Sequence, residues 1–501
     1  MKVALISPYS SITSLGVRLL SACLKEAGHE VKLVFAPAYP KAYARIRFKD
    51  KPYREEALAS LSDLCSDCGL IGVSLMTNFF QAAVQITETL HERIQSPIIW
   101  GGIHPTVCPE QCLQHADLIC VGEGEEALPE LAERLANDGS AEGIHNIWSR
   151  KDGEIQRTSA RPWVQNPADF PILDSFVESH YAITADRSKI VPIDEKLKVH
   201  HLMNDATSPG APYYQTTTTR GCPRNCTYCG NSAFRLIGGA KGYCRTISTD
   251  WVMKDLHLGV EKYNPHYIIF DDECLSCRTL EDIEEFSERY RKEIGLPFRA
   301  MATPPSITEA KMECLVAAGL AQLEIGVQSA SPRILELYER TWANAEKVAA
   351  AAKIVTKHKA QMTPIYDFII DNPYETSEDT VRSAWLIRDL PRPALFQIFS
   401  LMLYPGTEIA IKAEKDGLVD EEHYKAIYQR HYMEQKPSYC NLLCSIAVRQ
   451  PPRWLFRLLT SRTALFLFDR RWLEPVYWLL YKAKRTFVTA RDRRRFRIHE
   501  R

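Results

Sequence analysis

The chain has 501 residues, of which 45% are hydrophobic, and this is enough for two to four domains with separate cores. No uncharged apolar run approaches the ~20 residues that a membrane-spanning helix requires, and Met1–Pro8 is typical of a strand and not of a leader, so we expect a cytoplasmic protein. The formal net charge of zero conceals a basic end, because residues 449–501 hold 15 Lys and Arg against 4 Asp and Glu.

Residues 1–145 alternate short apolar runs with helical stretches, which indicates a parallel, doubly wound sheet. The expected strands are Val3–Ile6, Val31–Phe35, Leu70–Leu75, Ile98–Trp100 and Leu118–Val121, and the expected helices include Leu15–Ala27 and Phe80–Ile94. Ligands of such sheets bind outside the carboxyl ends of the strands. The loops expected there are Ser74–Asn78, Gly101–Thr106 and Gly122–Glu126.

Glycines in these loops would let the backbone approach a large ligand closely, although ordinary turn chemistry explains each loop equally well. No G-x-G-x-x-G follows the first strand, which disfavours a nucleotide. The loops therefore favour some other flat or bulky ligand.

After a linker at residues 146–210, an expected strand at Tyr213–Thr219 runs into a loop with the spacing C-x3-C-x2-C. Its cysteines are Cys222, Cys226 and Cys229. Three thiolates suit a cubane iron-sulfur cluster, because the fourth iron is then left without a protein ligand and can do chemistry. The 15 cysteines of the chain would produce this spacing about 0.01 times by chance, so the spacing carries information.

Other uses of the cysteines agree less well with the sequence than a cluster does. A zinc site needs four ligands, and the nearest further candidate, Cys244, lies beyond a Gly-rich stretch. Disulfides disagree with the odd cysteine count and the absence of a signal peptide. The C-x2-C pairs Cys65/Cys68 and Cys274/Cys277 are only mildly surprising, so buried thiols explain them better than a second cluster.

The order of these motifs, beginning with Ser14–Gly16 in the first domain, resembles the radical S-adenosylmethionine enzymes that carry a cobalamin-binding domain. The resemblance covers residues 1–420. It implies an α/β protein with a Rossmann-like cobalamin domain at 1–145, a (β/α)6 partial TIM barrel at 211–425 and a C-terminal helical region at 426–501. The later barrel segments would be Tyr267–Glu273, Phe298–Thr303, Glu324–Ser329, Ile365–Glu375 and a closing segment at Leu403–Glu408.

The resemblance also implies which residues hold the three cofactors. A 4Fe-4S cluster would bind Cys222, Cys226 and Cys229, and S-adenosylmethionine would bind Asp271, Asp272, Glu324 and Gln328. Cobalamin would contact Ser74, Thr77, Gly101, Gly102, His104, Gly122, Glu123 and Gly124. The two aspartates have other readings, either as paired carboxylates for acid-base work or as helix caps for Leu275 onward.

One departure from the family concerns the lower cobalt ligand. None of the 14 histidines lies in a D-x-H-x-x-G pattern, so cobalt would have water or nothing beneath it, and His104 would be a pocket or turn residue. The same departure leaves open a degenerate domain that has lost cobalamin.

The chemistry implied is reductive cleavage of S-adenosylmethionine to methionine and a 5′-deoxyadenosyl radical, with an electron from a partner such as flavodoxin or ferredoxin. The leading expectation is a cobalamin-dependent C-methyltransferase acting on a small molecule. Rearrangement, cyclisation or ring contraction is the first alternative. A cobalamin-binding or electron-transfer protein without radical chemistry is the second.

The C-terminal region mixes arginine with large apolar residues at near-helical spacing from Arg449 onward. This composition is typical of an interfacial amphipathic helix pair at an anionic membrane, which would place the protein at the inner membrane face and favour a lipid-like substrate. A helix pair packed on the barrel with a solvated basic end is the competing interpretation. Arg491–Arg497 suggests nucleic acid as a partner. Nucleic acid is nevertheless disfavoured, because such a tail binds phosphate and does not indicate a specific partner.

Overall fold

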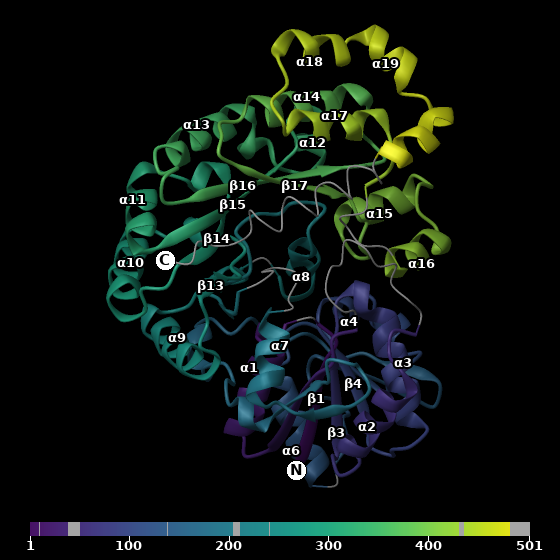
Figure 1. The fold of residues 1–501 in the computed structure, drawn as a ribbon. Coiled ribbons are helices and arrows are strands. Elements are labelled where there is room, and N and C mark those ends of the chain that lie inside the picture. Colours follow the sequence, from purple (N-terminus) through teal and green to yellow (C-terminus); the bar gives the residue numbers. More distant parts are fainter. Residues whose placement is uncertain are drawn as a thin grey trace. The chain divides into compact units, whose positions relative to one another are not determined.

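The computed structural model describes residues 1–9, 11–38, 51–137, 139–203, 211–239, 241–429 and 435–480 (Figure 1). The basic residues at 482–485 and Arg491–Arg497, on which part of the tail hypothesis depends, lie outside these ranges. The chain divides into two compact units, which are described separately. Unit 1 comprises residues 1–269 with 403–431, and unit 2 comprises residues 270–402 with 432–501.

Unit 1 is built on a nine-stranded sheet with the order β7-β6-β5-β4-β3-β1-β2-β8-β9. Its centre is parallel and consists of β1 (Lys2–Ser7), β2 (Glu30–Phe35), β3 (Leu70–Ser74), β4 (Ile98–Gly101) and β5 (Leu118–Cys120). Uninterrupted apolar runs form these strands because both faces of a parallel sheet are covered. The helices are α1 (Leu15–Glu26), α2 (Glu55–Cys65), α3 (Phe80–His91), α4 (Ile103–Val107), α5 (Pro109–Cys112) and α6 (Ala127–Ala136).

Residues 146–203, for which the sequence predicted only a linker, contribute four more strands to this sheet. They are β6 (Ile147–Lys151), β7 (Glu154–Gln156), β8 (His180–Ile183) and β9 (Ile190–Pro192), followed by α7 (Glu195–Met203). β6 and β7 pair antiparallel beyond β5, whereas β8 is parallel to β2 and β9 closes that edge antiparallel. Their shortness and half-exposed side chains explain why the apolar pattern did not reveal them.

A second sheet has the order β10-β13-β14-β15-β16-β17. Its strands are β10 (Tyr213–Thr216), β13 (Tyr267–Phe270), β14 (Phe298–Ala302), β15 (Leu320–Gln328), β16 (Thr363–Ile370) and β17 (Leu395–Ser400). β14 to β17 are parallel and alternate with helices. Six strands in chain order are what a partial barrel requires, so the predicted fold class is confirmed.

The helices of the second sheet follow its strands in sequence. Those before β14 are α8 (Gly230–Gly238), α9 (Thr249–Tyr263) and α10 (Leu280–Glu293), and a small antiparallel ladder, β11 (Thr219–Arg220) with β12 (Arg245–Thr246), flanks α8. The later helices are α11 (Glu309–Ala318), α12 (Pro332–Leu337), α13 (Ala345–Thr356) and α14 (Ser377–Asp389).

The C-terminal part is helical, as predicted. α15 (Glu408–Lys415) and α16 (Glu421–Gln429) belong to unit 1, and α17 (Tyr439–Ala447), α18 (Arg453–Leu459) and α19 (Arg462–Phe468) belong to unit 2 (Figure 1). α17 packs along α14. Within the described part of the chain, no helix is both long and apolar enough to cross a membrane.

Candidate functional site

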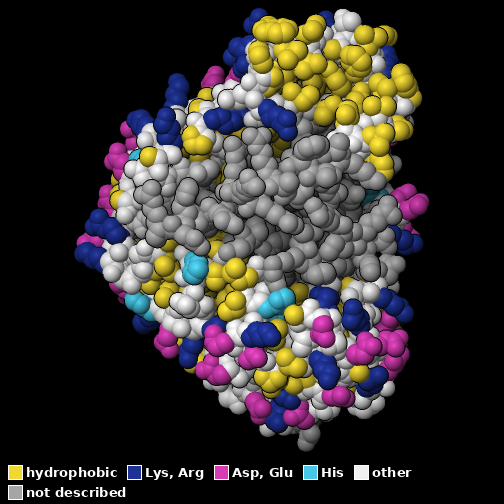
Figure 2. Space-filling model, in the orientation of Figure 1, with side chains coloured by type: hydrophobic (Ala, Val, Ile, Leu, Met, Phe, Trp, Pro, Cys, Tyr) yellow, Lys and Arg dark blue, Asp and Glu magenta, His cyan; other side chains and the backbone are white. Residues whose placement is uncertain are grey.

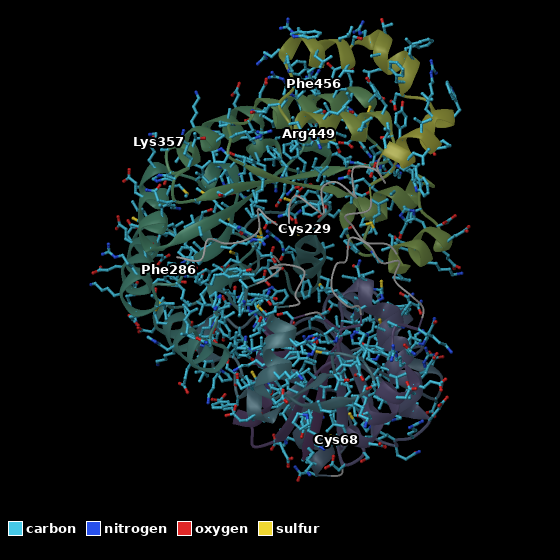
Figure 3. The ribbon with its side chains drawn as sticks, in the orientation of Figure 1. Cys68, Cys229, Phe286, Lys357, Arg449 and Phe456 are labelled. Atoms are coloured by element: carbon cyan, nitrogen blue, oxygen red, sulfur yellow. A yellow bond between two sulfur atoms is a disulfide. The ribbon has the colours of Figure 1, made fainter. Side chains whose placement is uncertain are left out.

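The three motif cysteines lie on the loop that joins β11 to α8, in unit 1. Cys226 is buried, and Cys222 and Cys229 are partly exposed. Cys229 precedes the first turn of α8 and donates its backbone N–H to the carbonyl of Cys226 at 3.0 Å (Figure 3). The short loop therefore ends with Cys229 at the N-terminus of α8, an end that stabilises negative charge.

Backbone contacts fix the shape of this loop. Gly221 has φ +75°, and a Cβ there would lie 2.4 Å from the carbonyl oxygen of Tyr243, so only glycine fits. The carbonyl of Thr227 accepts a hydrogen bond from the N–H of Ile409 at 3.0 Å, and Asn225 donates to Glu408 at 3.1 Å. The start of α15 thus holds the middle of the loop from the other side.

The arrangement fits a cluster better than a single metal ion. A structural zinc ion needs four ligands that converge on one point. A cubane cluster with one open iron needs only three cysteines from the protein, each bound to a different iron. Cys244, the candidate fourth zinc ligand, is exposed.

Two arginines that flank the cysteine loop bind the glycine-rich loop after β5. Arg220 pairs with Glu123 at 2.9 Å and with Glu125 at 2.6 Å, and Arg245 pairs with Glu123 at 2.7 Å. Burial disfavours the charge on Arg220, but Glu125 and Glu123 outweigh it and raise its pKa. The loop at 122–126 and the ladder that carries the cysteines are therefore tied together within unit 1. In this structure the predicted cobalamin residue Glu123 makes these ion pairs.

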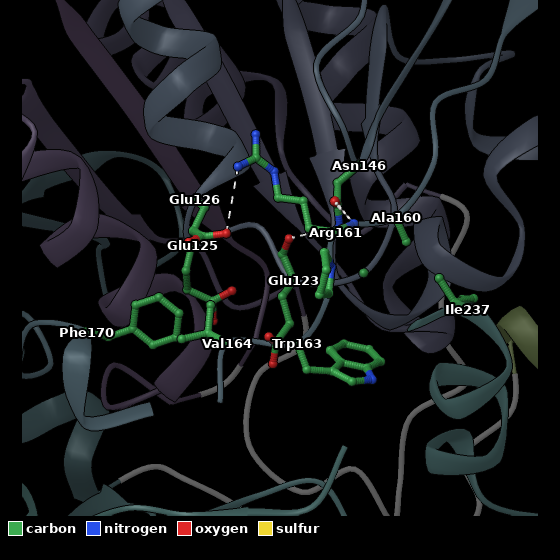
Figure 4. A pocket seen from close by; sticks show the side chains of 12 residues that line it. Glu123, Glu125, Glu126, Asn146, Ala160, Arg161, Trp163, Val164, Phe170 and Ile237 are labelled. Atoms are coloured by element: carbon green, nitrogen blue, oxygen red, sulfur yellow. Dashed lines mark hydrogen bonds and ion pairs between the residues drawn. The ribbon is translucent and has the colours of Figure 1, made fainter. Parts of the chain in front are cut away.

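A small pocket borders the same loop (Figure 4). Its walls include the aromatic rings of Trp163 and Phe170, and Arg161 lies across from Glu126 at 3.7 Å. These residues come from the stretch that the sequence predicted to be a linker, so sequence reasoning missed them. Arg220 could have been found from the sequence, because it lies two residues before Cys222.

The predicted cobalamin loops meet at the carboxyl edge of the N-terminal sheet. Ser74 and Gly101 end neighbouring strands and are aligned in register, and buried Thr77 begins the turn after β3. Gly102 has φ +103°, and a Cβ there would lie 2.7 Å from the carbonyl oxygen of Leu75. Packed this closely, the loops after β3 and β4 present backbone and small side chains at the edge where ligands of such sheets bind.

The glycines after β5 continue this cradle. Gly122 has φ +90° and leaves only 3.1 Å between a built Cβ and the Asn146 amide nitrogen, and at Gly124 a Cβ would lie 3.3 Å from Leu20. A Cβ at either position would press on these neighbouring atoms, so the backbone lies close against Asn146 and Leu20. The glycines therefore let the loop backbone pack closely at the edge where a large flat ligand such as cobalamin would bind.

His104 lies within α4 and is completely buried. Its ring packs edge-on against Phe80 at 5.0 Å and Tyr428 at 5.7 Å between centroids. Burial lowers its pKa to about 4, so the ring is neutral at pH 7. This packing agrees with a structural residue.

The four residues predicted to bind S-adenosylmethionine lie in unit 2. Asp271 is exposed and Asp272 is buried, immediately after β13. The short helical turn that follows, Leu275–Cys277, starts after Cys274, so neither aspartate occupies its cap position and the helix-cap interpretation is wrong. Glu324 and Gln328 both lie on β15, on the face opposite the buried Leu323, Ile325 and Val327.

A disulfide joins Cys274 and Cys277 in the same turn, which corrects the expectation of unpaired thiols for this pair. The turn brings their Cα atoms to 5.4 Å, inside the range that a disulfide bridges. Spacing alone could not reveal this, because it depends on the turn that the chain adopts after β13.

Two charged residues missed by sequence reasoning share the face of β15 that carries Glu324. Arg299 of β14 forms an ion pair with Glu324. Asp367 of β16 is aligned with Gly326, is only 7% exposed, and has one carboxyl oxygen with no hydrogen-bond partner among the described residues. Burial raises the pKa of Asp367 to about 8, against a smaller opposing effect of Arg299. A lone Asp inside the apolar run of β16 was the signal available in the sequence.

We expect Asp367→Asn to stabilise the protein at alkaline pH. The native carboxyl keeps its proton up to about pH 8, whereas the unfolded one loses it near pH ~4. Between these values the native state binds more protons, so its stability falls as pH rises. The thermal midpoint of the variant should match that of the wild type near pH 4 and exceed it at pH 8.5. Parallel pH profiles for the two proteins would contradict the assignment.

Comparison with known proteins matches two domain models. Residues 1–132 match the B12 binding domain, and residues 216–384 match the radical SAM superfamily. The chain is 24% identical over 403 residues to an uncharacterised methyltransferase of Pyrococcus horikoshii, covering 79% of this chain and 77% of that one. It is also 24% identical over 434 residues to the bacteriochlorophyllide d C-8(2)-methyltransferase of Chlorobaculum tepidum, covering 82% and 80%.

Among solved structures, the radical S-adenosylmethionine methyltransferase TsrM from Kitasatospora setae, with cobalamin and a [4Fe-4S] cluster bound, has a TM-score of 0.63. The match covers 83% of this chain and 78% of TsrM at 15% identity. At 15% identity this similarity supports a shared fold alone.

Proposed function

The chain belongs to the radical S-adenosylmethionine enzymes that carry an N-terminal cobalamin-binding domain, and we propose that within this family it transfers a methyl group to carbon of a small molecule. Its cofactors are a 4Fe-4S cluster, S-adenosylmethionine and cobalamin. The observation that carries the proposal is the cysteine loop, which Arg220 ties to the glycine-lined edge of the B12-binding sheet. Named relatives that span most of the chain are methyltransferases, which supports this choice over cyclisation or rearrangement.

We assign the cluster to Cys222, Cys226 and Cys229. When bound, the cofactors supply the reductive cleavage of S-adenosylmethionine and the methyl transfer, while the protein supplies position and exclusion of water. The loop keeps its thiols fixed through Gly221 and the contacts to α15, and burial of Cys226 limits access of water to that thiol.

For S-adenosylmethionine we assign Asp271 or Asp272 to the ammonium group, because a carboxylate after an apolar strand is a strong acceptor for a cation. Glu324 and Gln328 would hydrogen-bond other polar groups of the same molecule. In this assignment Arg299 fixes the Glu324 carboxylate and is a positioning residue.

For cobalamin we assign the edge formed by Ser74, Thr77, Gly101, Gly102 and the loop at 122–124. His104 would support the wall from behind, because its neutral ring is enclosed by Phe80 and Tyr428. Glu123 would act through its ion pairs with Arg220 and Arg245, or exchange them for contacts with the corrin side chains.

The remaining parts of the proposal concern partners and location. A small reductant such as flavodoxin or ferredoxin would supply the electron in the cytoplasm. We also propose peripheral contact with the inner face of the membrane and a lipid-like substrate.

The test is product analysis in cells fed methionine with a trideuterated methyl group. A metabolite that gains three mass units per transferred methyl group in the parent strain, and that is lost on deletion of this gene, would identify the substrate. The purified, anaerobically reconstituted enzyme should form 5′-deoxyadenosine and S-adenosylhomocysteine with that substrate. Formation of 5′-deoxyadenosine without S-adenosylhomocysteine would overturn methyl transfer, and formation of neither would overturn radical chemistry.

A further inference from the structure

The C-terminal helices of unit 2 bury one face and expose another that is equally apolar. On the inner side Phe456 is fully buried and packs edge-on against Trp385 of α14 at 4.8 Å between ring centroids (Figure 3). Trp385 also donates to the hydroxyl of Thr460 at 3.2 Å, and buried Tyr477 donates to the carbonyl of Phe468 at 2.6 Å. Through this inner face α18 and α19 thus pack against the rest of unit 2.

The outer side carries ten of the fifteen large apolar side chains that are exposed in the described part of the chain. We call them the apolar surface: Trp454, Leu458, Phe466, Leu467, Phe468, Trp472, Val476, Trp478, Leu479 and Leu480. They gather over α18, α19 and the helical residues 471–480 that follow, in the yellow area at the upper right of Figure 2. Trp454, Phe466 and Trp472 are 67–74% exposed, which for aromatic side chains amounts to on the order of 400 Å².

An apolar area of this size on a helical layer that already has its packing partner indicates a binding surface. Packing on the barrel and contact with a partner, the two interpretations that the sequence left open, are therefore not alternatives. The same short helices do both, with opposite faces.

The charges around the apolar surface identify the kind of partner. Arg453, Arg457, Arg462 and Arg470 are exposed, and the guanidinium of Arg470 lies 4.2 Å from the ring centre of Phe466. Of the two acidic residues between 453 and 480, Asp469 is held by the hydroxyl of Ser377. The 21 residues after position 480 add nine Lys and Arg against two Asp and Glu. Tryptophan, aliphatic side chains and a basic rim suit the interface of an anionic bilayer.

We propose that residues 453–480 dock the enzyme on an anionic membrane surface through the apolar surface and its arginine rim. Helices of seven residues cannot span a bilayer, so the contact lies in the plane of the headgroups. That the substrate itself is taken from the membrane rests on the function proposed above. The docking itself does not depend on methyl transfer, because it involves none of the cofactor residues.

The test is flotation of the full-length holoenzyme with vesicles of phosphatidylcholine alone or mixed equally with phosphatidylglycerol. The wild type should float with the mixed vesicles and much less with the neutral ones. Trp454→Ser combined with Phe466→Ser and Trp472→Ser should abolish flotation, whereas Leu418→Ser, at an exposed leucine outside the surface, should not change it. Arg457→Gln with Arg462→Gln should weaken binding about fivefold per arginine and reduce its salt sensitivity.

Circular dichroism, iron content and the cobalamin spectrum of each variant separate lost docking from lost folding. Sedimentation velocity of the wild type and the triple variant tests whether a second copy of the chain covers the apolar surface instead. A wild type that remains at the bottom with mixed vesicles, or a dimer that only the triple variant dissolves, would overturn the proposal. Such a result would leave the formation of 5′-deoxyadenosine unaffected, so failure of docking and failure of the proposed function are distinguishable.

Discussion

Replacing Cys226 by alanine should eliminate formation of 5′-deoxyadenosine and leave cobalamin binding intact. Even residues that only support a metal ligand typically cost 10–100-fold, so loss of a ligand should lower the rate by more than about a hundredfold. Cys226 is the buried member of the three, and no other thiol of the loop replaces it. Iron per protein should fall from about four in the reconstituted wild type. The measurements are iron content, the visible spectrum and chromatography of the nucleoside.

Cys244→Ala is the matched control for this variant, because Cys244 directly precedes β12 of the same ladder but is exposed. Iron content and nucleoside formation should stay at the wild-type level. If Cys244→Ala lost metal together with Cys226→Ala, the four-ligand zinc site would be favoured over the cluster. If Cys226→Ala lost cobalamin as well, the ion pairs of Arg220 with Glu123 and Glu125 would be the first explanation to examine, since they join the two loops.

The sequence was informative where function depends on residues close together in the chain. The spacing of Cys222, Cys226 and Cys229 needs no partner from elsewhere, and buried parallel strands such as β1 are recognisable from composition alone. Contacts between distant residues were missed for the opposite reason. Arg220 pairs with Glu123 only because β11 lies beside the loop after β5, and the sequence of neither segment indicates this contact.

The C-terminal region shows a second limit. Periodicity described an amphipathic helix pair, but it could not say which apolar face would find a partner within the chain. The structure resolves this with Phe456 packed on α14 and Trp454, two residues earlier, pointing outward. An amphipathic pattern identifies the more apolar face of a helix. Here apolar side chains lie on both faces, so the pattern could not show which face packs within the chain.

Arg18→Met should cause the largest loss of stability. Arg18 is fully buried in α1 and donates to Tyr214 and Ser175 at 2.5 Å and to the carbonyl of Asp174 at 2.9 Å. Tyr214 in turn donates to buried Asp255 at 2.9 Å. Burial raises the pKa of Asp255, and the positive charge of Arg18 opposes that shift. Removing Arg18 leaves a buried carboxylate without its counter-charge, at a cost of about 3–5 kcal/mol.

The effect should appear as a decrease of roughly 10 °C in the midpoint of thermal unfolding of unit 1, at 2–4 °C per kcal/mol for a large unit. Arg134→Met, which removes a partly exposed ion pair with Glu130, should change the free energy of unfolding by no more than about 1 kcal/mol. A double-mutant cycle identifies the cause. If charge compensation is responsible, Asp255→Asn combined with Arg18→Met should cost less than the sum of the single changes by about 0.5–3 kcal/mol. Strict additivity would instead assign the loss to the hydrogen bonds of Arg18, through which α1 holds β10 and the segment around Asp174 in one network.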